Sequence, residues 1–259
     1  MRMNTIGLIV RDVSDALDVL LEIVHSSTHH DTQTKIKLFR DLGSARVGLD
    51  LQGMRIGIPW HLSDLASLHE AKLGPLKRII DALSRAGATV IHDVQISGAL
   101  EFEPLPLSEK SVLLDTDMKV AVDTYLSSLT TNPQRVHNLN DLIAFTKSCS
   151  AENYPLRNVE GFQRAAATSP LDETYLRLSA RDEYFATDGG IEGALGRHRC
   201  NVLLVPTLCV TLQTFAAKAG SPVMSVPMGS YPPGTIVERG EHNDLVNVAP
   251  GIPYVIKKL

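Results

Sequence analysis

The chain has 259 residues, of which 44% are hydrophobic and 21% charged, and it carries a formal net charge of −4. Such a composition is typical of a globular protein that buries a sizeable core, and it gives no reason to expect nucleic acid or an anionic membrane as a partner. Neither a membrane span nor a secretory signal is predicted, because no apolar run is long enough and the first residues lack a cationic start followed by an apolar segment.

The first predicted element is an amphipathic helix over residues 12–24. Its apolar residues recur at steps of three and four, as a helix with one buried face requires. They are Val13, Ala16, Leu17, Leu20, Leu21 and Val24. Because the helix begins only a few residues into the chain, we expect its apolar face to be exposed.

A strand, a helix and a second strand are predicted next. Residues 55–59 and 90–92 are short apolar runs typical of strands, and residues 69–86 between them have helical periodicity. Gly87 is expected to end that helix, because glycine tolerates the left-handed conformation that follows many helices. Gly57 is expected to allow close approach of the backbone. The order indicates a parallel sheet covered by helices.

The middle of the chain is predicted to be mainly helical. A linker over residues 101–106 precedes a long helix over residues 108–129, and Asn140 is expected to cap a helix over residues 141–147. Further elements are expected as follows: a mainly helical stretch over 171–199, a buried strand over 202–205, and a short helix or turn over 212–218.

The C-terminal stretch from Ala219 to Tyr254 is dense in proline and glycine, which fix backbone geometry. Val223–Val226 is predicted to be a buried strand that Gly220 and Pro222 introduce and Pro227 ends. Later in the stretch, an apolar run over residues 245–248 leads into Pro250, Gly251, Ile252 and Pro253.

Few residue patterns indicate chemistry. A metal site at His25, His29 and Asp31 is an alternative, although a polar loop is favoured because no further ligand cluster accompanies it. The three cysteines are odd in number and have no CxxC spacing, which favours a reduced, cytoplasmic compartment.

Two further groups of residues, three glycines and three serines, are assigned structural rather than chemical roles. An anion-binding role for the glycines at 189, 190 and 193 is set aside in favour of packing, because a helix interior offers no free N–H groups. The serines near the end have no evident base beside them and are interpreted as turn and strand residues. They are Ser221, Ser225 and Ser230.

The chain nevertheless resembles the amidase signature family, in particular its fungal acetamidase-like branch. The resemblance rests on the runs AGSPVMSVPMG, YPPGT and DLVNVAPGIPY within residues 219–254. Upstream, TIGLIVR at residues 5–11, MRIGIP at 54–59, NPQRVHNLNDLIAF at 132–145 and NVLLVPT at 201–207 match in the family's order. The resemblance implies an α/β fold with a mixed, largely buried sheet covered by helices. Residues 1–259 would form one partial amidase domain, the C-terminal part of that fold.

The resemblance also implies an activity whose catalytic residues this sequence lacks. Members of the family hydrolyse carboxylic amides with a serine nucleophile and a second serine in a Gly/Ser-rich run, together with an upstream lysine. No Gly-Gly-Ser-Ser-Gly-Gly-like run occurs here, so no catalytic residue, metal or cofactor is assigned and the chain alone is expected to be inactive. Its candidate partners are a small-molecule amide and an N-terminal amidase half. A non-catalytic pseudoenzyme or complementation module is the alternative.

The site residues that the resemblance suggests belong to the wall of a pocket. Thr207 follows the predicted strand over 202–205 and is the candidate substrate-binding residue, since strand ends in α/β sheets often face ligands. The favoured alternative is that Thr207 caps the next turn. The other residues are structural. They are Gly220, Pro222, Pro227, Pro250, Gly251 and Pro253.

Overall fold

The computed structural model describes residues 7–11, 13–25, 50–206, 209–240 and 248–258. The chain divides into two compact units, one comprising Met3–Gln52 and the other comprising Met1–Arg2 with Gly53–Leu259. Each unit is described by itself. None of the described helices is long and apolar enough to cross a membrane.

The smaller unit contains the helix α1, Val13–His25, which confirms the helix predicted over residues 12–24. Asp15 in its first turn faces the partial positive charge of the helix N-terminus. Of the apolar face predicted for this helix, Leu20 is exposed and Ala16 and Leu21 are partly exposed, and the side chains of Val13, Leu17 and Val24 lie outside the described residues. The proposed ligands His29 and Asp31 lie outside the described residues, as does the side chain of His25.

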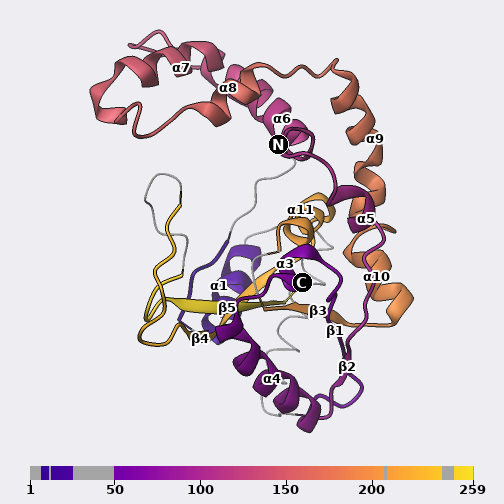
Figure 1. The fold of residues 1–259 in the computed structure, drawn as a ribbon. Helices are drawn as coiled ribbons and strands as arrows, with labels where there is room; N and C mark the ends of the chain where they lie inside the picture. The colour runs from indigo at the N-terminus through magenta and orange to yellow at the C-terminus, as the bar shows by residue number, and fades with distance from the viewer. Residues whose placement is uncertain (1–6, 12, 26–49, 207–208, 241–247, 259) are drawn as a thin grey trace. The chain divides into compact units, whose positions relative to one another are not determined.

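The larger unit is built on a mixed five-stranded sheet (Figure 1) with the strand order β2-β1-β3-β5-β4. β1 runs parallel to both β2 and β3, whereas β5 runs antiparallel to both β3 and β4. The mixed α/β architecture predicted from the sequence is therefore confirmed. The strands are β1 Arg55–Gly57, β2 Thr89–Ile91, β3 Val202–Val205, β4 Met224–Ser230 and β5 Pro253–Lys258.

The first three elements of the sheet region form as the sequence predicts. Between β1 and β2 runs α4, Glu70–Arg85, which begins where the His69 side chain accepts a hydrogen bond from the Ala71 N–H. It ends just before Gly87, whose φ of +99° is the left-handed conformation expected of a C-terminal glycine. The two flanking strands pair in parallel, as a connection through a helix requires.

The core lies around β3, where all four residues are buried. Gly57 on β1 lies so close to this core that a Cβ there would be 2.6 Å from Val94 Cγ2 and 3.0 Å from Leu203 Cδ2. The predicted close approach at Gly57 is thus confirmed. An aromatic cluster of Phe102, Phe185 and Phe215 extends the core into the helices, with ring centroids 5.2–5.7 Å apart.

The helices largely follow the prediction, with three corrections. The expected linker over residues 101–106 begins as the helix α5, and the expected helix over 171–199 is two helices, α9 and α10. The cap of α7 is Asn138, whose side chain accepts from the Asp141 N–H at 3.0 Å, and not Asn140, which lies within the helix. The bounds are α3 Ser63–Ala66, α5 Ala99–Phe102, α6 Leu107–Ser127, α7 Leu139–Ser148, the 3-10 turn η1 Ser150–Glu152, α8 Glu160–Ala166, α9 Glu173–Ala186, α10 Ile191–His198 and α11 Val210–Ala219.

The glycines between α9 and α10 serve packing, as predicted, but for a different reason. Gly189 and Gly190 lie at a break between two helices and not in a helix interior. A Cβ at Gly190 would lie 2.1 Å from the Phe185 carbonyl oxygen, and one at Gly189 would lie 2.5 Å from the Tyr184 ring. Their N–H groups donate to the carbonyls of Tyr184 and Thr187, so neither is free to bind an anion.

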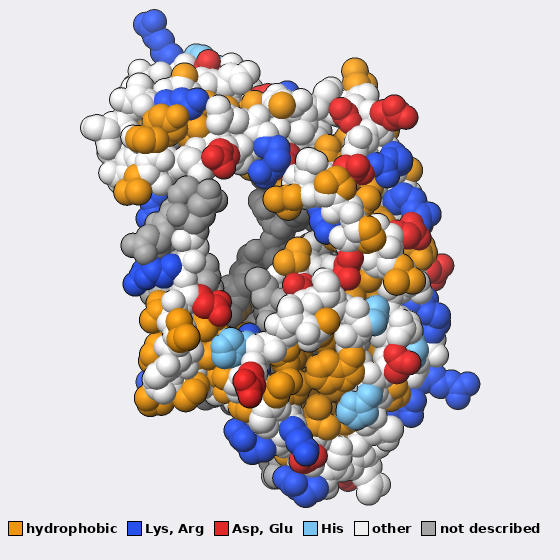
Figure 2. All heavy atoms as spheres, viewed as in Figure 1, with side chains coloured by type: hydrophobic (Ala, Val, Ile, Leu, Met, Phe, Trp, Pro, Cys, Tyr) orange, Lys and Arg blue, Asp and Glu red, His pale blue; other side chains and the backbone are white. Residues whose placement is uncertain are grey.

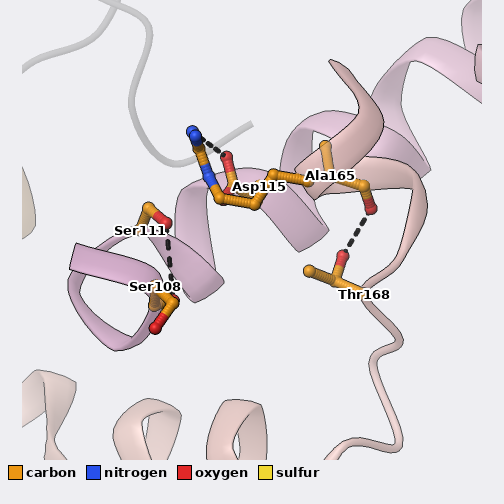
Figure 3. A network of polar contacts seen from close by, with 6 residues as sticks. Ser108, Ser111, Asp115, Ala165 and Thr168 are labelled. Atoms are coloured by element: carbon orange, nitrogen blue, oxygen red, sulfur yellow. Dashed lines mark hydrogen bonds and ion pairs between the residues drawn. The ribbon is translucent and has the colours of Figure 1, made fainter. Parts of the chain in front are cut away.

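A polar network holds α6 against α8 (Figure 3). The buried carboxylate of Asp115 accepts from Arg164 Nε at 2.6 Å and from Arg164 Nη2 at 3.2 Å. The Lys119 ammonium donates to the carbonyls of Ala166 and Thr168 at the end of α8. Since cations are favoured at a helix C-terminus, the two contacts together fix the mutual position of the helices.

The C-terminal strands require a correction. β4 extends through Pro227 to Ser230, and its residues are mostly exposed rather than buried. The prediction treated an apolar run as a strand covered on both sides, whereas β4 is the edge strand of the sheet, where proline is tolerated because one side needs no partner. Pro227 pairs with Val255, and a register shift follows before Gly229. Both features blunt the open edge.

Candidate functional site

The candidate site lies at the carboxyl ends of the parallel strands β1 and β3. These strands pair through Ile56 with Val202 and Gly57 with Leu203, so they end at the same edge of the sheet. Ligands of open α/β sheets bind in the crevice outside such strand ends. After β1 the chain continues through Ile58 and Pro59 to Trp60 and His61. The residues that follow β3 include Thr207, which lies outside the described residues, and Cys209.

Two carboxylates connect the loops at this edge. The Asp64 side chain accepts from the Val210 N–H at 2.9 Å, at the start of α11. The Glu103 side chain accepts from the Ser63 N–H at 3.3 Å, at the start of α3, and from the Thr211 hydroxyl at 3.2 Å. Both acids therefore satisfy N–H groups at helix N-termini, which is a structural role.

Cys209 lies beside these acids and is only 1% exposed. Burial raises the pKa of its thiol from the ordinary 9.0 to about 12. The negative charges of Asp64 and Glu103 act in the same direction, and the Leu212 N–H opposes them. Because the thiolate is the reactive form of cysteine, Cys209 is a packed thiol and not a nucleophile at neutral pH.

His61 has one ring nitrogen in use and one buried without a partner. Its Nε2 accepts from the Ile96 N–H at 3.3 Å, so a neutral ring carries its hydrogen on Nδ1. Within the described residues, that Nδ1 is buried and has no hydrogen-bond partner. The ring is thereby held in one tautomer, with a donor directed into the protein interior.

A hollow of about 600 Å³ lies where the motif YPPGT meets the start of α4. Pro232, Ile236 and Glu238 line one side, and His69 and Glu70 line the other. Thr235 also lines the hollow, and its hydroxyl donates to the Pro232 carbonyl at 2.8 Å. None of the described lining residues is a serine, cysteine or lysine, so we interpret the hollow only as a binding surface.

The C-terminal motif residues secure the last two strands. Gly220 ends α11 with a φ of +68°, and Gly251 forms a turn with a φ of +77°. In that turn the Gly251 N–H donates to the Tyr231 carbonyl, and the Tyr231 N–H donates to Ile252. Pro253 begins β5, Pro222 is exposed ahead of β4, and Pro250 lies in the turn.

The aromatic residues of the same motif pack on α4. Tyr231 contacts both Tyr254 and His69 edge to face, with ring centroids 5.0 and 5.1 Å apart. The Tyr254 hydroxyl donates to the Ala71 carbonyl at 3.2 Å. Burial raises the pKa of Tyr231, as expected for a phenol in this cluster. The motif thus ties β4 and β5 to the first turn of α4.

Sequence reasoning missed the cluster at the sheet edge. The structure brings Asp64, Glu103 and Cys209 to one place, although the three are far apart in the sequence. The only sequence signal for these residues is that some of them follow predicted strands. The described serine hydroxyls that donate hydrogen bonds donate to main-chain carbonyls, as at Ser67 and Ser127, and the Ser169 hydroxyl accepts from the Leu171 N–H.

The fold and the comparison with known proteins together define the protein class to which the chain belongs. The described unit is an α/β protein with helices against a mixed sheet. The amidase family matches residues 1–237, and the chain belongs to that family. A putative amidase of Arthroderma benhamiae is 28% identical over 98% of this chain and 43% of its own length. A probable amidase of Arabidopsis thaliana is 27% identical over 88% of this chain and 43% of its own length.

Solved structures agree on the fold. The native peptide amidase of Stenotrophomonas maltophilia matches with a TM-score of 0.59 and 22% identity, over 96% of this chain and 48% of that one. An amidase family protein of Bacillus anthracis matches with a TM-score of 0.65 and 17% identity, over 99% of this chain and 45% of that one. The chain therefore spans less than half the length of these relatives.

Proposed function

We propose that residues 1–259 are the C-terminal part of an amidase that hydrolyses the C–N bond of carboxylic amides, and that they do not hydrolyse amides by themselves. The observation that carries this proposal is the family match over residues 1–237 in a chain that spans only 43% of the Arthroderma relative. The sequence has no Gly-Gly-Ser-Ser-Gly-Gly-like run to supply a nucleophile.

The polar groups at the sheet edge support the second half of the proposal. Asp64 and Glu103 are engaged in capping, and Cys209 is held as a neutral thiol. None of the three is poised to attack a carbonyl. What the described edge offers is the wall of a site whose reacting serine would come from elsewhere in the fold.

In the complete enzyme the reaction would be a serine-mediated acyl transfer. The serine oxygen forms a bond to the amide carbon, the C–N bond breaks, and the leaving nitrogen takes a proton to depart as ammonia or an amine. Water then cleaves the acyl-serine ester to release the carboxylic acid. We assign this chain to the intracellular, acetamidase-like branch, and the 28% identity to a fungal relative supports the branch.

The test is complementation. The chain is co-expressed with the N-terminal part of the Arthroderma relative, and ammonia release from acetamide, benzamide and a peptide amide is measured. We expect activity only when both parts are present, and none when the signature serine of the added part is replaced by alanine. Serine-dependent hydrolysis by the 259-residue chain alone would refute the proposal, as would an inactive pair.

Thr207 is the residue of this chain that we propose to contact substrate. In the sequence it comes two residues after the end of β3, and residues that follow strands in α/β sheets often face ligands, to which a threonine hydroxyl can donate. In the complemented pair, Thr207→Val should raise KM several-fold with a smaller effect on kcat, whereas Thr131→Val, at an exposed position, should change neither. Unchanged KM values across the three amides would remove Thr207 from the site.

A further inference from the structure

The long helix α6 is apolar on two opposite sides. On one side the buried residues Val112 and Leu113 pack against Leu178 of α9. On the other side an apolar stripe, named here the α6 seam, repeats at steps of three, four and seven residues. The α6 seam consists of Leu107, Leu114, Met118, Ala121 and Tyr125. A surface helix normally has a polar side opposite the one that faces the core, so a second apolar side is unusual.

The α6 seam is open to solvent. Leu107 is 72% exposed, Leu114 50% and Tyr125 64%, while Met118 and Ala121 are partly exposed. Hydrophobic side chains also reach the surface among charged ones on the face shown in Figure 2. Single exposed leucines are ordinary, but several exposed apolar residues that share one side of a helix mark an interaction surface.

The opposite side of α6 is fixed by specific contacts. Asp115 pairs with Arg164, the Tyr175 hydroxyl donates to Asp117 at 3.0 Å, and Glu109 pairs with Arg177. These contacts hold the helix to α8 and α9, so rotation that would turn the α6 seam inward would break them. The seam is therefore displayed by a rigid support and not by a frayed helix.

We infer that the α6 seam is the docking face for the part of the amidase fold that lies outside residues 1–259. This inference rests on the proposed function. Its support is length: the chain superposes over 96–99% of itself on proteins of which it covers only 45–48%. More than half of those folds thus has no counterpart here, and it needs apolar surface on this half to pack against. From Leu114 to Tyr125 no member of the seam is charged, which fits such a core-like contact, whereas Lys110 lies on the same side of the helix between Leu107 and Leu114.

The experiment uses the same pair, with the N-terminal part of the Arthroderma relative as the probe. Leu114→Glu places a carboxylate at the centre of the seam, and Leu171→Glu is the matched control, since Leu171 is 85% exposed and outside α6. The affinity of each variant for the probe is measured by titration, together with thermal melts of the chain alone. We expect unchanged melts, affinity at least about tenfold weaker for Leu114→Glu, and no change for Leu171→Glu.

The outcomes separate the two proposals. If the unaltered pair is active and Leu114→Glu binds as tightly as the unaltered chain, the docking assignment is wrong and the proposed function stands. An unaltered pair that neither binds nor hydrolyses refutes the proposed function itself. A chain that forms a dimer by sedimentation, lost in Leu114→Glu, would overturn the inference in favour of a second copy as the occupant. If Leu114→Glu melts lower, Tyr125→Glu, at a 64% exposed position, provides the same comparison.

Discussion

At the scale of single residues, glycine and cysteine have their roles set by what surrounds them. Gly57 and Gly190 stand where a Cβ would strike neighbouring atoms, whereas Gly196 has no atom within 4 Å of that position. Cys209 is buried beside two carboxylates. Because of these different surroundings, the same substitution of glycine by alanine is expected to have opposite effects at Gly190 and at Gly196.

Gly190→Ala should destabilise the protein by about 2–3 kcal/mol, because the new Cβ would collide with the main chain of α9, which cannot yield as a side chain does. The distance to the Phe185 carbonyl oxygen would be 2.1 Å. Gly196→Ala is the control. Gly196 lies at an exposed position of α10, and the substitution should stabilise the protein by about 0.5–1 kcal/mol. Urea unfolding measures both, and equal effects would contradict the packing role.

Cys209 should make stability fall at high pH. Its pKa is about 12 in the folded protein and 9.0 ordinarily, so the unfolded chain loses this proton first as the pH rises. The contribution of the protonated Cys209 thiol to the free energy of unfolding is complete below pH 9.0 and is lost as the pH approaches about 12. Between these values the thiol contributes a slope of about −1.4 kcal/mol per pH unit to the free energy of unfolding.

The measurement is urea unfolding of the unaltered chain and of Cys209→Ala across this pH range. The difference between the two curves isolates the cysteine from tyrosines and lysines that titrate nearby. A difference that stays flat with pH would show that the folded thiol ionises normally.

At the scale of elements, helix ends and strand edges are where the structure departs from the sequence pattern. α7 is capped by Asn138 and not by Asn140, because Asn138 has the extended backbone that lets its side chain accept from the Asp141 N–H. β4 continues through Pro227 because an edge strand tolerates a missing donor. Both errors concern where an element ends, which propensity alone defines poorly.

The cap of α7 gives a direct comparison. Asn138→Ala should lower the free energy of unfolding by about 1 kcal/mol, because the Asp141 N–H loses its acceptor. Asn140→Ala, at an exposed position inside the same helix, should be neutral or slightly stabilising. Urea titrations of the two variants decide between them, and the reverse order would restore Asn140 as the cap.

At the scale of the whole molecule, the fold has exposed apolar surface against which a further layer of structure can pack. The α6 seam is exposed, and β4 at the sheet edge is mostly exposed along its length. Pro227 and the register shift next to it limit strand addition at that edge, so the helical seam is the better docking face.

The chain by itself should therefore be marginally stable. We expect a melting temperature below about 45 °C, and a rise of several degrees when the N-terminal part of the Arthroderma relative is bound, because ligands of the folded state stabilise it. Differential scanning calorimetry of the chain and of the pair measures both. A cooperative transition above about 65 °C for the chain alone would show that its core is sufficient.

The sequence by itself determined the kinds of elements and their order. Hydrophobic periodicity located α4, α6 and β3, and the glycine after α4 located its end, because these signals depend only on neighbours along the chain. The family motifs likewise depend on local spacing. Only the tertiary structure placed β4 at an edge, divided the helix at Gly189 and Gly190, and joined Asp64, Glu103 and Cys209 at the ends of the strands. Those features depend on contacts between residues distant in sequence, which the linear pattern does not encode.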